Sequence, residues 1–519
     1  MPCLSAMLSE YDVRLQAPVE DLHQATRLLE MVRAVWVLVR VVAVWVLEER
    51  LQALAQPATV WPRCGQCGRR LRSQGFRARQ LLTLFGELHW KRRVGRCPGG
   101  CPGQVTPLDD VLGLAPQQRY GAEVQALGCR LAVFVPYETA VRLLQQLTGI
   151  AVAPGTVWNW VQRLGVGLVQ EVEADLRALE AGDCRGQESV PPALRGQPMA
   201  IGADGVLVPF RPHGGSPKGK TRWGEVKVAI VARLGRWVNR QGRLVTRLAQ
   251  RRWVAVHGGL DALQARLWLE ALRQQICSIP HVIWLSDGGR GFWNLFERCF
   301  KRLGVIGILD FYHAAQYLYK GVKAVFDGRT QRCQATFTRW RHYLRHGRQR
   351  RLSAEIQTLL ASPSLPNTAR QTLAHLQHYL HAHQAHLDYP RFKAYGWPIG
   401  SGLVESACQW LIQQRFKGVG MRWSEPGFDH LLPLRLAWIN QRLDQVLPTL
   451  HPLYVLVCSL MNEYYLFPEG ERRWLLGVID RYTPGLKKTV GELGSSCPSL
   501  EKNPNRCLGL KSPHWQGRE

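Results

Sequence analysis

The stretch from Met199 to Ala314 constrains the fold more than any other part of the chain, because its pattern changes between that of strands and that of helices. Three segments, MAIGADGVLVPF, RWGEVKVAIVARLG and LVTRLAQRRWVAVHGG, are typical of successive strands joined by basic or glycine-containing turns. The next segments predict a helix (LDALQARLWLEALRQQIC), a fourth strand (HVIWLSDGG), a helix (GFWNLFERCFKRLG) and a fifth strand (VIGILDFYHA). This order predicts an α/β sheet with mixed pairing.

The charge balance indicates a polyanionic partner. The 519 residues include 67 Lys and Arg against 39 Asp and Glu, which gives a net charge of +28. Nucleic acid is favoured over a membrane surface, and a merely basic soluble protein is the alternative. The length predicts about three or four domains at ~150 residues each. The hydrophobic content of 46% is enough for a sizeable core.

Cysteine usage and the most apolar run both favour a reducing cytoplasm. The 14 cysteines lie in a long chain that shows no secretory signal, so a disulfide scaffold is not expected. The run from Ala34 to Leu47 is too short for a membrane span of about 20 residues and contains Arg40. It predicts a buried helix or a helix-packing surface, and no membrane partner.

A cysteine quartet predicts a structural zinc site. Cys64 and Cys67 form one pair, Cys97 and Cys101 form the second, and glycines beside each pair allow a tight turn. Four thiolates suit tetrahedral Zn²⁺ and leave no open position for catalysis, with four unrelated thiols as the alternative. The intervening sequence is typical of hairpin strands, and Trp61 to Cys101 has ten basic residues against one acidic residue. We therefore expect a zinc ribbon that binds DNA.

A second candidate for DNA binding follows in YETAVRLLQQLTGIAVAPGTVWNWVQRLG. The pattern predicts one helix from Glu138 to Leu147, a turn through Gly149 and a second helix beginning near Pro154. This is a helix-turn-helix candidate, with an ordinary helical hairpin as the alternative. The side chains that could face a DNA groove are those of Thr156, Asn159, Gln162 and Arg163.

Three acidic residues could together hold a divalent cation. Asp204 lies among apolar residues of the first predicted strand, where a carboxylate is costly unless it is paired or binds metal. Asp287 ends the fourth strand, so the two acids converge if these strands are neighbours, although Asp-Gly is also a common turn dipeptide. Glu405, in the first turn of a later helix, is the third candidate, with a helix-dipole role as its alternative. Oxygen ligands of this kind suit Mg²⁺.

Acids placed on a first strand, after a fourth strand and on a late helix match the plan of the ribonuclease-H-like nucleotidyl transferases. The chain resembles bacterial insertion-sequence transposases of the DDE type, and in particular the Kra-type group allied to the Mutator-like superfamily. The resemblance is carried by GADG at Asp204, SDGGRGF at Asp287, DFYHA at Asp310, and GSGLVES with KGVGMRW around Glu405. DFYH matches an Asp/Cys-x-x-His signature of such transposases, and the resemblance extends to about Leu443.

The resemblance implies a ribonuclease-H-like mixed sheet with a helical insertion between the second acid and the glutamate, where the basic helical block from Ala315 to Tyr389 fits. It implies that Asp204, Asp287 and Glu405 bind Mg²⁺ or Mn²⁺ and catalyse cleavage and strand transfer of DNA. No covalent enzyme intermediate is required.

Further residues acquire roles from the same resemblance. Asp310 and His313 would contact the scissile phosphate or orient a ligand, with a strand-end core position as the alternative for His313. Arg415, Lys417 and Arg422 are candidate phosphate contacts, although exposed basic residues are abundant in this chain. The run of histidines from His375 to His386 predicts a solvated or DNA-facing helix rather than a metal site.

The implied function is that of a DNA transposase in the bacterial cytoplasm, associated with the nucleoid. Its partners would be the terminal inverted repeats and the target DNA, and pairing two element ends implies a homo-oligomer in the DNA complex. Two alternatives are a non-catalytic DNA-binding protein with a degenerate nuclease fold and a ribonuclease-H-like nuclease that does not transpose.

The expected organisation has seven parts. These are an N-terminal helical region (1–56), a zinc-ribbon-like domain (57–110), a helix-turn-helix-like region (118–182), the first part of the catalytic core (197–320), a basic helical insertion (321–395), the last part of the core with the Glu405 helix (396–445) and a partly disordered C-terminal tail (446–519).

Overall fold

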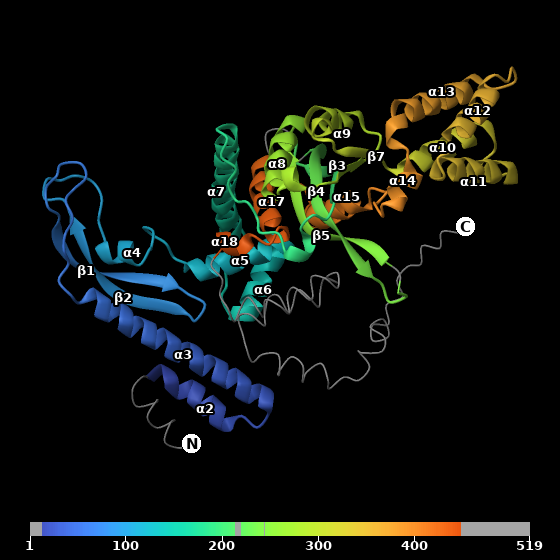
Figure 1. Ribbon diagram of the computed structural model, residues 1–519. Coiled ribbons are helices and arrows are strands. Elements are labelled where there is room, and N and C mark those ends of the chain that lie inside the picture. Colours follow the sequence, from blue (N-terminus) through green and yellow to red (C-terminus); the bar gives the residue numbers. More distant parts are fainter. Residues whose placement is uncertain (1–12, 213–218, 243, 448–519) are drawn as a thin grey trace. The chain divides into compact units, whose positions relative to one another are not determined.

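A five-stranded mixed sheet forms where the sequence pattern changes (Figure 1). The computed structural model describes residues 13–212, 219–242 and 244–447, so the expected tail falls almost wholly outside the described residues. The strands are β3 (Met199–Phe210), β4 (Arg222–Val238), β5 (Leu244–His257), β6 (Val282–Ser286) and β7 (Ile306–Leu309), in the order β5-β4-β3-β6-β7. The pairs β3–β4 and β4–β5 are antiparallel, whereas β3–β6 and β6–β7 are parallel. The predicted mixed sheet is confirmed.

The fifth strand is shorter than the sequence predicts. We expected a strand through Ala314, but β7 ends at Leu309 and helix α10 (Phe311–Val325) begins directly after Asp310. Asp310 is the N-cap residue, and its Oδ1 accepts hydrogen bonds from the backbone N–H groups of Tyr312 (2.6 Å) and His313 (3.1 Å). Satisfying these N–H groups stabilises the helix start, so DFYHA is a helix beginning and not a strand.

Helices follow the strands β5 and β6, and the first of these helices packs on the sheet. The helices α8 (Leu260–Arg273) and α9 (Arg290–Leu295) connect the later strands, and α9 continues into the π-helical turn η4 (Phe296–Phe300). The helix α8 packs on β4 and β5. All five residues of β6 are buried, as expected for a parallel strand that is covered on both faces.

The N-terminal region consists of two helices and a hairpin. The helices α2 (Gln16–Gln24) and α3 (Leu28–Ala55) precede β1 (Arg72–Leu82) and β2 (Glu87–Arg96), which pair antiparallel, as the sequence between the cysteine pairs predicts. A short helix, α4 (Pro107–Val111), follows. A hydrophobic cluster joins α3 to the hairpin through Val44, Leu47, Leu51, Leu81, Leu88, Trp90, Leu108 and Leu114.

The apolar helix α3 is a helix-packing surface, the second of the two alternatives that its sequence predicts, and not a fully buried helix. Its side chains at Ala34, Val44 and Ala55 are buried, but Leu28 is 76% exposed and Val39 is 51% exposed. One face therefore packs on the hairpin, while apolar side chains of other faces meet solvent in the described part of the chain. No helix among the described residues is long and apolar enough to span a membrane.

The helix-turn-helix candidate forms part of a larger helical unit. The helices are α5 (Ala122–Phe134), α6 (Tyr137–Thr148) and α7 (Pro154–Glu180). Gly149 ends α6 in the left-handed conformation with φ 75°, which favours glycine because it has no Cβ. The two predicted helices are observed, but α7 is 27 residues long and packs along α17 (Glu425–Ile439).

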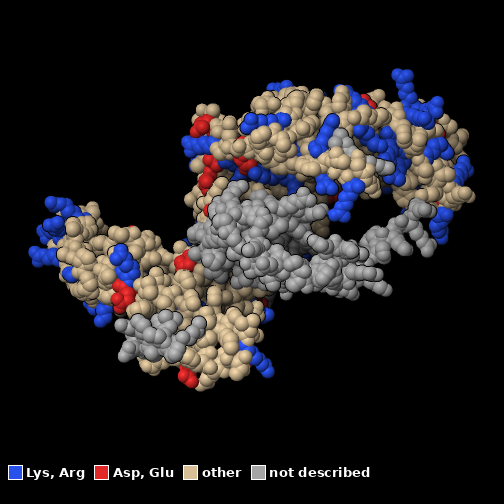
Figure 2. Space-filling view, turned by 60° about the horizontal axis from the view of Figure 1, so that its bottom comes forward, with Lys and Arg blue, Asp and Glu red and all other residues tan. Residues whose placement is uncertain are grey.

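A helical insertion separates β7 from the last core helices. It contains α10, α11 (Gln331–Arg345), α12 (Gln349–Leu360), α13 (Asn367–Ala382) and α14 (Tyr389–Ala394). From Ala315 to Tyr389 there are eleven Lys and Arg against three Asp and Glu. Figure 2 shows basic side chains crowded over the insertion, at the right of the view. This surface attracts polyanions.

The last described segment returns to the sheet. The helix α15 (Gly402–Ala407), the π-helical turn η7 (Cys408–Gln413) and α16 (Gln414–Phe416) form one continuous helical stretch, and α17 and α18 (Leu443–Val446) follow. The helix α15 packs on β3 and β4, and α17 packs on β5. The helix that carries Glu405 therefore lies against the strand that carries Asp204.

An ion-pair network fixes the connection between α7 and β3. Glu188 accepts hydrogen bonds from Arg252 of β5 (2.8 Å) and from Arg442 (2.5 Å), which also pairs with Glu270 of α8 (2.7 Å). Burial raises the pKa of Glu188, but the hydrogen bond and charge of Arg252 and the charge of Arg442 outweigh it and bring the pKa to about 2. Glu188 is therefore ionised whenever the protein is folded near neutral pH.

We expect Glu188→Gln to destabilise the protein by about 2 kcal/mol at neutral pH, because two partly buried guanidinium groups lose their shared carboxylate. A carboxylate with a lowered pKa contributes stability that is complete above about pH 4.5 and is lost as the pH falls toward 2. The melting temperatures of wild type and variant, followed by circular dichroism, should differ at pH 7 and approach each other between pH 5 and 3.

Glu171→Gln, which alters an exposed glutamate of α7, is the matched control and should leave the melting temperature unchanged. An equal difference between wild type and Glu188→Gln at pH 7 and pH 3 would contradict the role of the ionised network.

Candidate functional site

Asp204 and Asp287 lie at the same level of two adjacent parallel strands. The last paired residues of β3 and β6 are Gly202 and Leu285, and each aspartate follows two residues later. Because side chains alternate along a strand, residues two apart project to the same side. The two carboxylates therefore leave neighbouring strands side by side, as the sequence predicts for adjacent strands.

This position lies where β3 continues beyond the end of β6. Ser286 ends β6, whereas β3 continues to Phe210, which pairs with Trp423 in a parallel bridge. Between these pairings, Asp204 lies on a part of β3 that has no strand partner on that side among the described residues. In open α/β sheets, ligands bind at the carboxyl ends of strands.

Gly202 allows the helix of Glu405 to approach β3 closely. A Cβ at this position would lie 2.9 Å from Leu403 Cδ1 and 3.4 Å from Val404 Cβ. The bare backbone of Gly202 therefore lets α15 pack two residues away from Asp204, on the same side of the strand. Glu405 directly follows Val404 in α15, and its side chain remains exposed.

The three carboxylates are close enough to affect one another electrostatically. Burial raises the pKa of Asp204, and the negative charges of Asp287 and Glu405 raise it further, while His313 lowers it. Asp204 Oδ1 accepts a hydrogen bond from the N–H of Gly205 (2.7 Å). The structure thus brings together three acids from distant segments. Their mutual repulsion favours a bound cation, and oxygen donors of this kind suit Mg²⁺ or Mn²⁺.

Asp310 connects the end of β7 to the helix of Glu405. It is only 2% exposed, and its Oδ2 accepts hydrogen bonds from the N–H (2.9 Å) and the hydroxyl of Ser401. Ser401 is the N-cap residue of α15, and its Oγ lies 3.3 Å from Glu405 Oε1. A carboxylate buried in this way orients Glu405 through Ser401 and is not accessible to a DNA phosphate. Of the two roles considered for Asp310, the geometry fits the orienting one.

His313 lies beside Asp287 on the first turn of α10. Its Nε2 is 4.0 Å from Asp287 Oδ2, and its side chain is 38% exposed. The alternative interpretation of a strand-end core histidine is therefore wrong, since His313 is on a helix and partly open to solvent. Asp287 Oδ1 accepts a hydrogen bond from the N–H of Gly289 (3.0 Å), which closes the turn after β6.

Arg415 is misplaced among the predicted phosphate contacts. Its side chain is 1% exposed, its Nε donates to the carbonyl of Ala132 at the end of α5 (2.8 Å), and its guanidinium stacks near Trp423. A second buried arginine, Arg435, donates to Val133 O (3.0 Å) and to Leu411 O in η7 (3.2 Å). Both arginines are structural links between α5 and the helical stretch that begins with α15, because cations satisfy carbonyls at a helix C-terminus.

The other two basic candidates are exposed. Lys417 Nζ lies 5.8 Å from the centre of the Trp223 ring, and Arg422 Nη1 donates to Gly219 O (2.9 Å). Both follow the helical stretch of Glu405, on the segment that leads to Trp423. Their position leaves them available to a polyanion.

The four groove-facing candidates of α7 do not share one environment. Asn159 and Arg163 are exposed, and Thr156 is partly buried. Arg163 also donates to Gln125 of α5 (3.3 Å). Gln162 was expected to face DNA, but its Oε1 pairs with His430 Nδ1 of α17 (2.7 Å), so this side chain faces the core.

Part of the histidine run is packed into the core and not solvated as predicted. The ring of His386 lies 4.3 Å from that of Trp293, and its Nδ1 pairs with Gly307 O (3.1 Å). The ring of His383 lies 5.0 Å from Trp293, and burial lowers its pKa to about 4. The indole Nε1 of Trp293 in turn donates to the backbone carbonyl of Asp287 (2.6 Å). The insertion therefore reaches the site through Trp293, a residue that the sequence did not single out.

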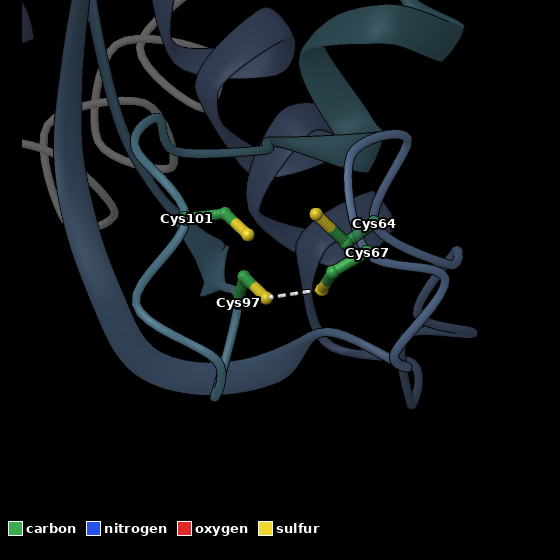
Figure 3. Close-up of side chains that lie close together, drawn as sticks. All are labelled: Cys64, Cys67, Cys97 and Cys101. Atoms are coloured by element: carbon green, nitrogen blue, oxygen red, sulfur yellow. Dashed lines mark hydrogen bonds between the residues drawn. The ribbon is translucent and has the colours of Figure 1, made fainter.

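The cysteine quartet comes together at the base of the β1–β2 hairpin (Figure 3). The sulfur atoms of Cys64, Cys67, Cys97 and Cys101 all lie within 4.8 Å of one another, and those of Cys67 and Cys97 are 3.3 Å apart. Zn–S bonds of about 2.3 Å in a tetrahedron place sulfur atoms about 3.8 Å apart, so the quartet could bind zinc.

The thiols of the quartet differ in pKa because each affects its neighbours. Hydrogen bonding from Cys67 and from the N–H of Gly99 lowers the pKa of Cys97 to about 7, whereas the neighbouring sulfurs Cys67 and Cys97 raise the pKa of Cys101 to about 12. Four thiolates at this spacing require a cation to balance them, and a divalent metal supplies it.

Comparisons with known proteins give two similarities. No protein-family model matches the chain. A curated protein described as "UPF0236 protein in vanSb 3'region", from Streptococcus gallolyticus, is 25% identical over 380 residues, which cover 70% of this chain and 73% of the relative. The Drosophila P element transposase strand transfer complex is matched at a TM-score of 0.25 and 10% identity, over 64% of this chain and 80% of that chain.

We expect the isolated protein to contain about one zinc ion per chain and Cys97→Ser to lose it, because three thiolates hold zinc much less tightly than four. The hydrophobic cluster with α3 should keep the far end of the hairpin folded, so that only the residues around 61–71 and 97–105 become sensitive to protease. Metal analysis and limited proteolysis measure both effects.

Cys277→Ser alters an exposed cysteine outside the quartet and serves as the control, with full zinc content. Full zinc content in Cys97→Ser would show that the quartet is not the zinc site.

Proposed function

We propose that this protein is a DNA transposase that uses Asp204, Asp287 and Glu405 as a catalytic DDE triad. The observation that supports this most strongly is the convergence of three carboxylates from three distant segments at one edge of the sheet. A structural role explains each acid alone, but it does not explain why like charges are gathered near one another. A site that binds divalent cations does explain it.

The proposed fold of the core is ribonuclease-H-like. Three antiparallel strands are followed by two parallel strands, with the first acid on β3, the second directly after β6 and the third on α15. The insertion α10–α14 lies in the chain between the second and third acids, where the resemblance places it. The Kra-type group is the proposed relative within the DDE transposases, on the motifs around the three acids.

The chemistry follows from the donor set. Mg²⁺ or Mn²⁺ held by the three carboxylates would polarise a phosphodiester and lower the pKa of an attacking water. Water attacks the phosphodiester at the element's end and releases a 3′-hydroxyl, which then attacks a phosphodiester of the target DNA. Ser401 and the buried Asp310 orient Glu405, and His313 is placed to hydrogen-bond Asp287 or a phosphate oxygen. No side-chain nucleophile is needed.

DNA is the proposed partner. The net charge of +28 includes the basic residues of the hairpin region and of the insertion. Such a surface binds DNA phosphates, because binding releases the counterions that surround the DNA. Asn159, Arg163, Lys417 and Arg422 are exposed and are proposed as DNA contacts. Two ends of an element must meet for transposition, so we propose that the DNA complex contains at least two copies of the chain.

The proposal is tested by cleavage of a labelled DNA duplex that carries the ends of the element flanking the gene, with Mg²⁺ or Mn²⁺. Asp204→Asn, Asp287→Asn and Glu405→Gln should each slow cutting at least about a thousandfold, because each removes a negatively charged ligand of the cations. DNA binding, measured by gel shift in the same samples, should persist. Joining of the cut end to a second DNA would separate a transposase from a nuclease that does not transpose.

Glu425→Gln is the matched control. Glu425, like Glu405, lies in the first turn of a helix, but it is exposed and pairs with Arg222. This variant should cut like wild type. Cutting that survives Glu405→Gln but is lost in Glu425→Gln would reassign the third acid. Binding of wild type without any cutting would favour a non-catalytic DNA-binding protein.

A further inference from the structure

The helical insertion presses a tyrosine onto the loop that follows Asp287. Tyr379 lies on α13, and a Cβ on Gly288 would be 2.2 Å from its Cε2 and 2.8 Å from its hydroxyl. Only glycine at position 288 allows this approach, because a methyl group at 2.2 Å from a ring carbon must displace one of the two. The insertion therefore contacts the backbone next to the second acid.

The ring of Tyr379 is part of a stack that encloses the same loop. It lies parallel to the ring of Tyr317 at 4.3 Å, and Tyr317 belongs to the helix that carries His313. The ring of His383 lies 5.1 Å from Tyr379 and 5.0 Å from Trp293, which donates to the Asp287 carbonyl. The loop of Asp287 is thus held from α9 through Trp293 and from α13 through Tyr379.

The hydroxyl of Tyr379 is buried without a hydrogen-bond partner among the described residues. The residue is 7% exposed, and its oxygen has no acceptor or donor within reach. A buried hydroxyl without a partner destabilises a protein, and a hydrogen-bond partner in another state of the site would explain its presence here. Burial raises the pKa of Tyr379, and the charges of Tyr317, Asp287 and Asp310 raise it further, so the group remains a neutral donor.

We propose that Tyr379 is a positioning residue for Asp287, an inference that rests on the proposed function. Its ring holds the loop from Asp287 to Gly289 against the insertion. Its hydroxyl donates a hydrogen bond to a backbone carbonyl of this loop when Asp287 turns toward a bound cation. The two glycines permit that rotation of the backbone, because a glycine without a Cβ can also reach conformations closed to other residues. The insertion is then a part of the cation site.

The test measures Mn²⁺ binding to the zinc-loaded full chain by the electron paramagnetic resonance signal of free Mn²⁺, together with the melting temperature. Tyr379→Phe removes the hydroxyl and keeps the ring. It should weaken Mn²⁺ binding by roughly three- to tenfold, the equivalent of one hydrogen bond. Its melting temperature should equal or exceed that of wild type, since an unpartnered buried hydroxyl is removed.

Two further variants separate positioning from a general structural role. Tyr137→Phe removes another buried phenol hydroxyl without a partner, on α6, and should leave Mn²⁺ binding unchanged. In an Asp287→Asn background, Tyr379→Phe should cause no further loss, because the hydroxyl acts through that carboxylate.

Different results would contradict the role of Tyr379 and the proposed carboxylate site. If Asp204→Asn weakens Mn²⁺ binding but Tyr379→Phe binds as tightly as wild type, the carboxylate site stands and the role of Tyr379 is wrong. An equal loss from Tyr379→Phe with and without Asp287 would also overturn it. If the chain binds no Mn²⁺ that depends on Asp204, both the proposed function and this inference fail.

Discussion

The buried carboxylate of Asp310 is the interaction on which the arrangement of the site depends. One of its oxygens accepts a hydrogen bond from an N–H group in the first turn of α10, and the other accepts one from Ser401 at the start of α15. A carboxylate that is 2% exposed is stable only when its oxygens are hydrogen-bonded, so it defines both helix starts at once. The residues it joins are 91 positions apart in the chain. This link holds the start of α15 beside the start of α10. It therefore helps to keep Glu405, which follows the insertion in the chain, near Asp204 and Asp287.

Two glycines allow other segments to pack closely against the backbone near the acids. Gly202 admits Leu403 and Val404 against β3, and Gly288 admits Tyr379 against the loop of the second acid. Gly202 lies two residues from Asp204 and Gly288 lies next to Asp287, so the packing that builds the fold also sets the positions of these carboxylates. The protein brings three negative charges near one another while its overall charge is +28. A cation bound at the proposed site would offset the repulsion between these acids and an approaching polyanion.

Local sequence signals predicted much of this architecture. The strands β3 to β6, the hairpin between the cysteine pairs and the neighbourhood of Asp204 and Asp287 follow from short-range periodicity and strand order. The helix start at Asp310 was missed because ILDFYH continues an apolar run. An aspartate followed by a helix-compatible stretch is nevertheless an N-cap signal that could have located it.

Long-range packing explains the remaining errors. Arg415 comes shortly before the exposed Lys417 and Arg422 in the chain, and only the position of α5 decides that this arginine points inward. His386 packs on Trp293 across almost a hundred residues, and Arg435 meets α5 across about three hundred. Apolar side chains of α3 remain exposed although their sequence resembles that of a core helix. The periodicity within one segment does not predict which other segment its apolar face will contact.

We propose that three carboxylates from distant segments form one cation site. Anomalous X-ray scattering from crystals of the full chain grown with Mn²⁺ tests it most directly, because the signal locates the metal itself. We expect Mn²⁺ density in contact with Asp204, Asp287 and Glu405. Ordered Mn²⁺ bound elsewhere, with none at these three carboxylates, would contradict it.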